Sequence, residues 1–158
     1  MTFDEPLEDS IRLLNDALTD LGKKGVFENS DFLVGELSTK FFLDLNVSPV
    51  GRNTIPMSIQ ISAAGGYIGL DQKSEVYEWS SDFAKKSASD VRKLITCLLS
   101  SFIMVEYCGS NYTCFNVFNQ GGELLFSRPV IDGIFFLKHN CKKKLYSPIY
   151  PNASPTNQ

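Results

Sequence analysis

The sequence predicts an α+β domain in which an antiparallel sheet of hairpins is covered by an N-terminal helix and a central helix. Three observations support this. An apolar stripe at helical spacing opens the chain, a second stripe occupies about residues 81–100, and strand-like runs at 32–79 and 102–137 flank the second stripe. At 158 residues, one domain is the expected organisation. We place it at residues 1–146, followed by a flexible tail at 147–158.

The first helix is predicted over residues 6–21. Its apolar side chains recur at spacings of four and three residues, as on one face of an α-helix, and are Leu7, Ile11, Leu14, Leu18 and Leu21. Pro6 suits the first turn, where its missing N–H costs nothing. Gly22 offers a left-handed residue that ends the helix. Two heptads are too few for a coiled coil, so we expect this helix to pack on the sheet.

The first array of strands is predicted at Phe32–Leu37, Lys40–Val47, Ile55–Ala63 and Ser74–Trp79. In the third of these, apolar residues alternate with a polar face made of Ser58, Gln60 and Ser62. The pair Gly65-Gly66 fits a two-residue hairpin loop. This loop would place Ala63 opposite Ile68. It would also place Ile61 opposite Leu70, so that all four apolar side chains share one face.

The central helix is predicted over about residues 81–100. Ser80 or Ser81 can cap its first turn, and Asp82 in that turn favours the positive end of the helix dipole. Its inner face is apolar and consists of Ala84, Ala88, Val91, Ile95 and Leu98. The Ser-Ala-Ser segment at 87–89 is an alternative start for this helix. The width of the apolar face makes it the main packing surface of the domain.

The second array of strands is predicted at Phe102–Cys108, Cys114–Asn119, Glu123–Arg128 and Gly133–Lys138. Two registers are open for the first pair. A two-residue loop would bring Asn116 onto the apolar face, whereas an odd-length loop centred on Asn111 would pair Asn116 with Glu106. We choose the odd-length loop because it separates polar from apolar side chains better. It also places Cys108 opposite Cys114 at a separation that suits a disulfide, although we expect reduced thiols.

Charge and composition exclude several classes of function. The net charge is −3, and the one basic run, Lys142–Lys144, is interpreted as a solvated strand end, so no nucleic-acid binding is expected. The N-terminus lacks the basic and apolar regions of a signal peptide, and no apolar run has the ~20 residues of a membrane span. We therefore expect a cytoplasmic monomer with no membrane partner. Its acidic balance suits a basic protein partner.

Few features of the sequence point to catalysis. It contains no G-x-S-x-G elbow, phosphate-binding loop, H-E-x-x-H helix or dinucleotide fingerprint. The four cysteines form no C-x-x-C pair, and the chain has one histidine, His139, so a structural zinc set is not expected. We expect no enzyme activity, no cofactor and no metal. One catalytic alternative is a small hydrolase or transferase that uses Cys141 or Cys114 with His139.

Acidic and aromatic side chains gather where the first strand array meets the central helix. Four carboxylates and a tyrosine lie within residues 71–82. Aromatic side chains among acidic ones are typical of protein interfaces. We therefore predict that a partner-binding edge consists of Asp71, Glu75, Tyr77, Glu78 and Asp82. Two secondary candidates, on the outer face of the later hairpin, are Glu106 and Asn116.

The organisation of residues 74–128 resembles that of the small immunity proteins of bacterial polymorphic and contact-dependent toxin systems. The likeness rests on the segment Glu78–Asp82, the helix end Leu94–Leu99 and the meander from Val105 to Glu123. The resemblance implies a cytoplasmic, acidic and non-enzymatic protein that covers the active site of a cognate toxin. Many such toxins are nucleases with basic clefts, which an acidic surface complements. The resemblance assigns no individual residue.

A second resemblance is to type III secretion chaperones, which bind effector proteins. These are acidic, of similar length, and ordered helix, three strands, helix, two strands, helix. The first helix, the strands that follow it and the central helix are similar to that order. The strand-like runs at 123–128 and 133–138 depart from it, because a chaperone closes with a helix. A closing helix within residues 123–146 would therefore favour the chaperone.

Overall fold

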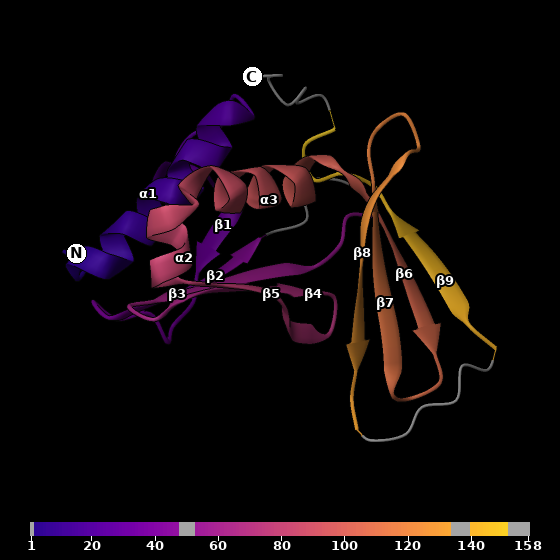
Figure 1. Cartoon of the computed structure of the whole chain (residues 1–158). Helices are drawn as coiled ribbons and strands as arrows, with labels where there is room; N and C mark the ends of the chain where they lie inside the picture. Colours follow the sequence, from indigo (N-terminus) through magenta and orange to yellow (C-terminus); the bar gives the residue numbers. More distant parts are fainter. Residues whose placement is uncertain (1, 48–52, 134–139, 152–158) are drawn as a thin grey trace.

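The chain folds into two antiparallel sheets, and a layer of helices covers one of them (Figure 1). The computed structural model describes residues 2–47, 53–133 and 140–151. Its helices are α1 (Glu5–Asp20), α2 (Ser81–Lys86) and α3 (Ala88–Ser100), together with a 3-10 turn, η1 (Val26–Glu28). The α+β prediction is confirmed, with the difference that the two strand arrays form two sheets instead of one.

Each strand array forms its own sheet. The first sheet is a meander in the order β1-β2-β3-β4-β5. Its strands are β1 (Phe32–Val34), β2 (Phe42–Val47), β3 (Met57–Ser62), β4 (Gly65–Leu70) and β5 (Lys73–Ser80). The second sheet has the order β8-β7-β6-β9. Its strands are β6 (Phe102–Cys108), β7 (Tyr112–Phe118), β8 (Leu124–Ile131) and β9 (Lys142–Tyr146).

The helices lie over one face of the five-stranded sheet, where α1 packs against β3 and β4 and α2 packs against β4 and β5 (Figure 1). The predicted alternation in β3 is confirmed: Ile59 and Ile61 are fully buried, while the polar residues between them stay half-exposed. A single hydrophobic core includes residues of both sheets and of all three helices. Among the described residues, no helix combines the length and the apolar character that a membrane span requires.

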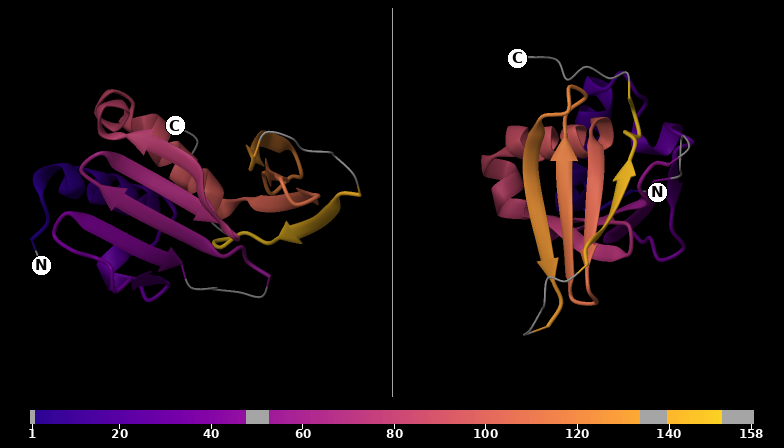
Figure 2. Two further views of the ribbon diagram at one scale, coloured as in Figure 1. Left: turned by 90° about the horizontal axis from the view of Figure 1, so that it is seen from below. Right: turned by 90° about the vertical axis from the view of Figure 1, so that its right-hand side faces the viewer.

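The four-stranded sheet faces this core with one side only. Ile103, Val105 and Phe115 on its inner face are almost completely buried. Seen face on, the sheet has all the helices behind it, and no described element lies in front of it (Figure 2, right). Its outer face is therefore open to solvent in the described part of the chain.

The first helix agrees with its prediction, but the central helix is broken. α1 begins with Pro6 in its first turn, and Gly22 follows it at a φ of 69°. The helix expected over residues 81–100 is instead α2 and α3, separated at Ser87, which has φ −134° and ψ 45°. The Ser87 N–H donates to Phe83 O and ends α2, while its carbonyl accepts from Asp90 N and starts α3. Serine favours such helix ends, and the alternative start at 87–89 is confirmed.

The hairpin between β3 and β4 has a different loop from the expected one. The loop residues are Ala63 and Ala64, and Gly65-Gly66 belongs to β4, so that Ile61 pairs with Gly66 instead of Leu70. The glycines are required by packing, because a methyl group on Gly66 would overlap the indole ring of Trp79. The predicted register was therefore wrong by four residues; Ile61, Ile68 and Leu70 still face the core, whereas Ala63 is exposed in the loop.

The hairpin between β6 and β7 is also shifted from its expected register. Its loop spans residues 109–111, so Glu106 pairs with Cys114 and Met104 pairs with Asn116. Because the shift is two residues, every side chain keeps its predicted face. The expected pairing of Glu106 with Asn116, and of Cys108 with Cys114, was wrong.

The cysteines also differ from their prediction. Cys108 forms a disulfide with Cys141, which precedes β9, whereas all four thiols were expected to be reduced. Cys97 and Cys114 are free. The two bonded cysteines are 33 residues apart in sequence, and the disulfide joins the edge strand β9 to the middle of its sheet.

The end of the chain departs from its prediction in two places. β8 continues through Pro129, which pairs with Cys114; as an edge strand it tolerates a residue that donates no hydrogen bond. Two residues of the expected tail are instead packed on the domain, because Ile149 and Tyr150 are each 3% exposed. The Tyr150 N–H donates to Leu99 O at 2.9 Å. Residues 134–138 of the predicted last strand, His139, and tail residues 152–158 lie outside the described residues.

Candidate partner-binding site

Three of the five residues predicted to form the acidic edge lie on the surface. Glu75 and Glu78 are exposed on β5, and Asp82 is exposed in the first turn of α2. The turn itself is fixed by Ser80, whose hydroxyl accepts a hydrogen bond from Phe83 N at 3.1 Å. The cap therefore holds the acidic end of β5 and the acidic start of α2 in one continuous segment.

A hollow lies beside these carboxylates, at the junction of β4, β5 and α2. Its volume is about 480 Å³, and it is lined by Ala64, Gly65, Tyr67, Glu78, Trp79, Ser80 and Phe83. Tyr67 stands directly opposite Glu78 in the β4–β5 register, and Phe83 is 47% exposed. A hollow lined by a carboxylate and two aromatic side chains suits a Lys or Arg side chain, which can pair with the carboxylate while the rings provide cation–π contacts.

The aromatic lining was missed by the sequence analysis. Tyr67 escaped notice because the expected hairpin register placed it beside the loop, away from Glu78. Phe83 was not considered because it lies outside the inner stripe of the central helix. The sequence did contain an indication of Phe83. It is the third residue after the capping Ser80, and its large apolar side chain directly follows the acidic Asp82.

Asp71 and Tyr77, the other two predicted edge residues, face the space between the sheets. The Tyr107 hydroxyl donates to the Asp71 carboxylate, and the Tyr146 hydroxyl lies 3.5 Å from it. Burial, and then the hydrogen bond to Asp71, raise the pKa of Tyr107. Asp71 therefore ties the first sheet to the second, and it is not part of the exposed acidic surface.

Tyr77 packs edge-on against Phe126 of β8, with ring centroids 5.8 Å apart. Its hydroxyl is buried and has no hydrogen-bond partner among the described residues. Burial raises the pKa of Tyr77 well above its ordinary value, so this phenol stays neutral. The structure therefore separates the five predicted residues into an exposed group of three and an inter-sheet group of two.

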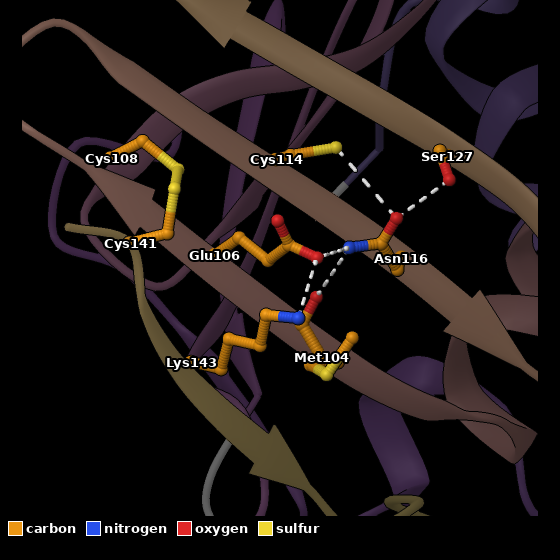
Figure 3. A network of polar contacts seen from close by, with 8 residues as sticks. All are labelled: Met104, Glu106, Cys108, Cys114, Asn116, Ser127, Cys141 and Lys143. Atoms are coloured by element: carbon orange, nitrogen blue, oxygen red, sulfur yellow. Dashed lines mark hydrogen bonds and ion pairs between the residues drawn. A yellow bond between two sulfur atoms is a disulfide. The ribbon is translucent and has the colours of Figure 1, made fainter. Parts of the chain in front are cut away.

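Glu106 and Asn116 meet on the outer face of the four-stranded sheet (Figure 3). The Asn116 amide nitrogen lies 3.4 Å from Glu106 Oε1 and 3.5 Å from Met104 O. Its amide oxygen accepts a hydrogen bond from the Ser127 hydroxyl at 2.6 Å and a longer one from the Cys114 thiol at 3.8 Å. These contacts satisfy a side chain that is 9% exposed, so Asn116 is held rigidly at the centre of this face.

Glu106 and Asn116 therefore form a separate group on the four-stranded sheet, whereas the acidic hollow lies at β4, β5 and α2. Lys143 of β9 lies 3.8 Å from Glu106, which leaves the pair without net charge. Around it, Leu125, Ile131 and Leu145 are between 43% and 52% exposed. The outer face is therefore apolar and neutral, whereas the hollow is aromatic and acidic.

The cysteines do not form a nucleophilic site in the described residues. Cys141 is held in the disulfide, and Cys114 is buried with its thiol directed at Asn116. Burial raises the pKa of Cys97, which keeps it as the less reactive thiol. His139, the proposed partner base, lies outside the described residues, so its geometry is not assigned.

Comparisons with known proteins add no family to this description. The chain matches no protein-family model. No curated protein and no solved structure matches it either. The case for a function therefore rests on the geometry of the acidic hollow, the neutral sheet face and the cysteines.

Proposed function

We propose that this chain is a non-enzymatic immunity protein that binds a cognate bacterial toxin and covers its active site. The observation that carries the proposal is the acidic hollow, which Glu78 lines together with Tyr67 and Phe83, while Glu75 and Asp82 are exposed in the same segment of the chain. Interfaces are enriched in aromatic side chains, and a basic cleft is attracted to exposed carboxylates before contact. The partner that fits best is a basic nuclease domain.

The proposed interface combines a buried aromatic residue with a half-exposed one. Trp79, which also lines the hollow, is 5% exposed and packs over Gly66. Phe83 is half-exposed, so an inserted basic side chain would remove its ring from water. Since the Ser80 cap already fixes the backbone at Phe83, little backbone entropy is lost on binding. Such preformed aromatic anchors are typical of binding hot spots.

Two alternatives receive less support. The hydrolase would need a reactive thiolate, but the bonded Cys141, the buried Cys114 and the raised pKa of Cys97 all oppose this. The type III secretion chaperone would need a closing helix within residues 123–146. The described parts of that range contain β8 and β9 and no helix.

The test begins with the open reading frame next to the gene for this chain, expressed as the candidate toxin. Co-expression of this protein is expected to restore growth, and calorimetry with the purified toxin domain is expected to give a 1:1 complex. The double charge reversal Glu75→Lys/Glu78→Lys should weaken binding by roughly 10- to 100-fold, in line with the loss of close charge pairs, without lowering the melting temperature.

A matched control is Glu28→Lys/Glu36→Lys, which changes the net charge equally at two exposed positions away from the hollow. This control should bind as tightly as the unmodified protein. Equal weakening by both double variants would reject the hollow as the site, because only overall charge would then matter. A failure of the neighbouring protein to bind at all would reject the toxin-binding function.

A further inference from the structure

The disulfide lies beside a carboxylate in an arrangement that suits a metal ion once the sulfurs are reduced. Among the described residues, Glu106, Cys108 and Cys141 form the group in which a carboxylate oxygen and two sulfur atoms all lie within 4.8 Å of one another. Glu106 and Cys108 are two residues apart on β6, so they share one face of the strand. Cys141 reaches them from the start of β9 (Figure 3).

We propose that reduction of the Cys108–Cys141 disulfide creates a zinc site formed by the two thiolates and Glu106. Zn²⁺ binds thiolate sulfur at about 2.3 Å and carboxylate oxygen at about 2.0–2.2 Å, which separates tetrahedral ligand atoms by roughly 3.3–3.8 Å. Once the disulfide is broken the two sulfur atoms must move apart to this spacing, and the carboxylate oxygen, now within 4.8 Å of them, must approach by at most about 1.5 Å. Three protein ligands leave the fourth position to water. This inference does not depend on the proposed toxin binding.

The negative charges of the three ligands are balanced by the zinc ion together with Lys143. Two thiolates and one carboxylate carry three negative charges, and Zn²⁺ neutralises two of them. The Lys143 ammonium, 3.8 Å from Glu106, is placed to balance the third. The Asn116 amide nitrogen, 3.4 Å from the same carboxylate oxygen, orients Glu106 from the other side. Neighbours of this kind hold a metal-binding side chain in its orientation and strengthen its binding to the metal.

The redox step is balanced by a dithiol reductant. The reductant's thiolate attacks one sulfur of the disulfide, and its second thiol completes the exchange. The reductant becomes a disulfide, while Cys108 and Cys141 become thiols. Each thiol then loses a proton as it binds the metal, so zinc binding releases up to two protons per chain. In the oxidised protein neither sulfur is a thiolate, and only Glu106 is left as a ligand.

The test uses the full chain in two redox states and Zn²⁺ alone as the probe. Protein reduced with a phosphine under anaerobic conditions should bind one Zn²⁺ per chain in competition with a chromophoric chelator. The oxidised protein should bind at least ~100-fold more weakly. Co²⁺ in place of Zn²⁺ should give thiolate-to-cobalt charge-transfer absorption in the reduced protein only. Absence of stoichiometric binding by the folded, reduced protein would overturn the proposal.

Substituted variants test which side chains bind the zinc ion. Glu106→Gln keeps the disulfide and the size of the side chain, and it should weaken zinc binding to the reduced protein by roughly 10- to 100-fold. Cys108→Ser/Cys141→Ser should abolish it, with circular dichroism used to verify the fold. Cys114→Ser is the matched control, because Cys114 is a free thiol on the same sheet outside the group. Loss of binding in this control, or retained binding in the double serine variant, would contradict the assignment.

Discussion

The two sheets use the same antiparallel alternation but place different chemistry on their open faces. On the five-stranded sheet the helices cover the apolar side, and the open side shows the polar residues Ser58, Gln60 and Ser62. Among the described residues, no helix covers the outer face of the four-stranded sheet. Its inner side joins the common core, and its open side keeps exposed apolar residues around Asn116. The comparison teaches that the helices cover the apolar side of the first sheet, while the second sheet joins the same core through its inner side chains and through a few specific polar contacts.

Those contacts come from several segments. Asp71 accepts from Tyr107, and the Arg128 Nε donates to Val76 O at 3.1 Å. The Asn53 amide donates to Leu145 O at 2.8 Å. Each joins the first sheet, or the segment between β2 and β3, to the second sheet. The second sheet is therefore held by these polar contacts in addition to its buried inner side chains, such as Val105 and Phe115.

The largest expected effect separates the two sheets directly. Leu45→Ala in β2 removes a side chain that is fully buried in the core, and it should lower the free energy of unfolding by about 3 kcal/mol. Leu145→Ala in β9 truncates a side chain that is 52% exposed, and the change should stay within about 0.5 kcal/mol. Urea denaturation measures both. Similar losses in the two variants would show that the outer face is covered in solution.

The next effect tests the position of Gly66 within β4, opposite Trp79 of β5. Gly66→Ala should destabilise the fold by about 1–3 kcal/mol, because the added methyl group would collide with the Trp79 ring and force it to move. Gly121→Ala is the control, since a methyl there would meet only Asn119 Oδ1 at 3.3 Å. Thermal unfolding and Trp79 fluorescence measure the difference. An unchanged spectrum and melting temperature in Gly66→Ala would contradict the observed pairing of Gly66 with Trp79.

These corrections indicate what the sequence could reveal and what it could not. Alternation predicted which face of each strand is buried, and this holds for Ile59, Ile61 and Ile68. It could not set the register, because shifts of two or four residues leave every side chain on its face. The glycine pair pointed to a turn, whereas its role is to accommodate Trp79 from another strand. Such long-range packing leaves no mark in the local pattern.

For the candidate site too, local properties could be read from the sequence, whereas long-range contacts could not. Exposed charges such as Glu75, Glu78 and Asp82 were identified, since charged residues are rarely buried. The inward positions of Asp71 and Tyr77 depend on the second sheet, whose placement no local pattern predicts. The pairing of Cys108 with Cys141 likewise joins residues 33 positions apart. Cross-strand neighbours are visible only once the strand order is known.

The smallest expected effect concerns the helix layer and depends on pH. The Arg92 guanidinium binds the Asp20 carboxylate through two nitrogens and joins α3 to α1. This hydrogen bonding lowers the pKa of Asp20. The stabilisation is therefore fully present above the pKa of Asp20 in the unfolded chain, about 3.9, and is lost as the pH falls through the lower pKa of the folded state.

Asp20→Asn should accordingly cost about 0.5–1 kcal/mol at pH 7, and the difference from the unmodified protein should shrink as the pH approaches 2. Asp9→Asn is the control, because the Asp9–Arg12 pair lies on one exposed helix face and should contribute close to nothing. Urea denaturation across this pH range measures both. A loss in Asp20→Asn that does not change with pH would exclude the ion pair as its cause.

We propose that a toxin binds the acidic hollow of the first sheet and leaves the open face of the second sheet free. Hydrogen–deuterium exchange on the complex with the neighbouring toxin domain tests it most directly. We predict protection in β4, the end of β5 and the start of α2, with no change in β6 and β7. Protection confined to the four-stranded sheet, with unchanged exchange around Glu78 and Phe83, would contradict the account.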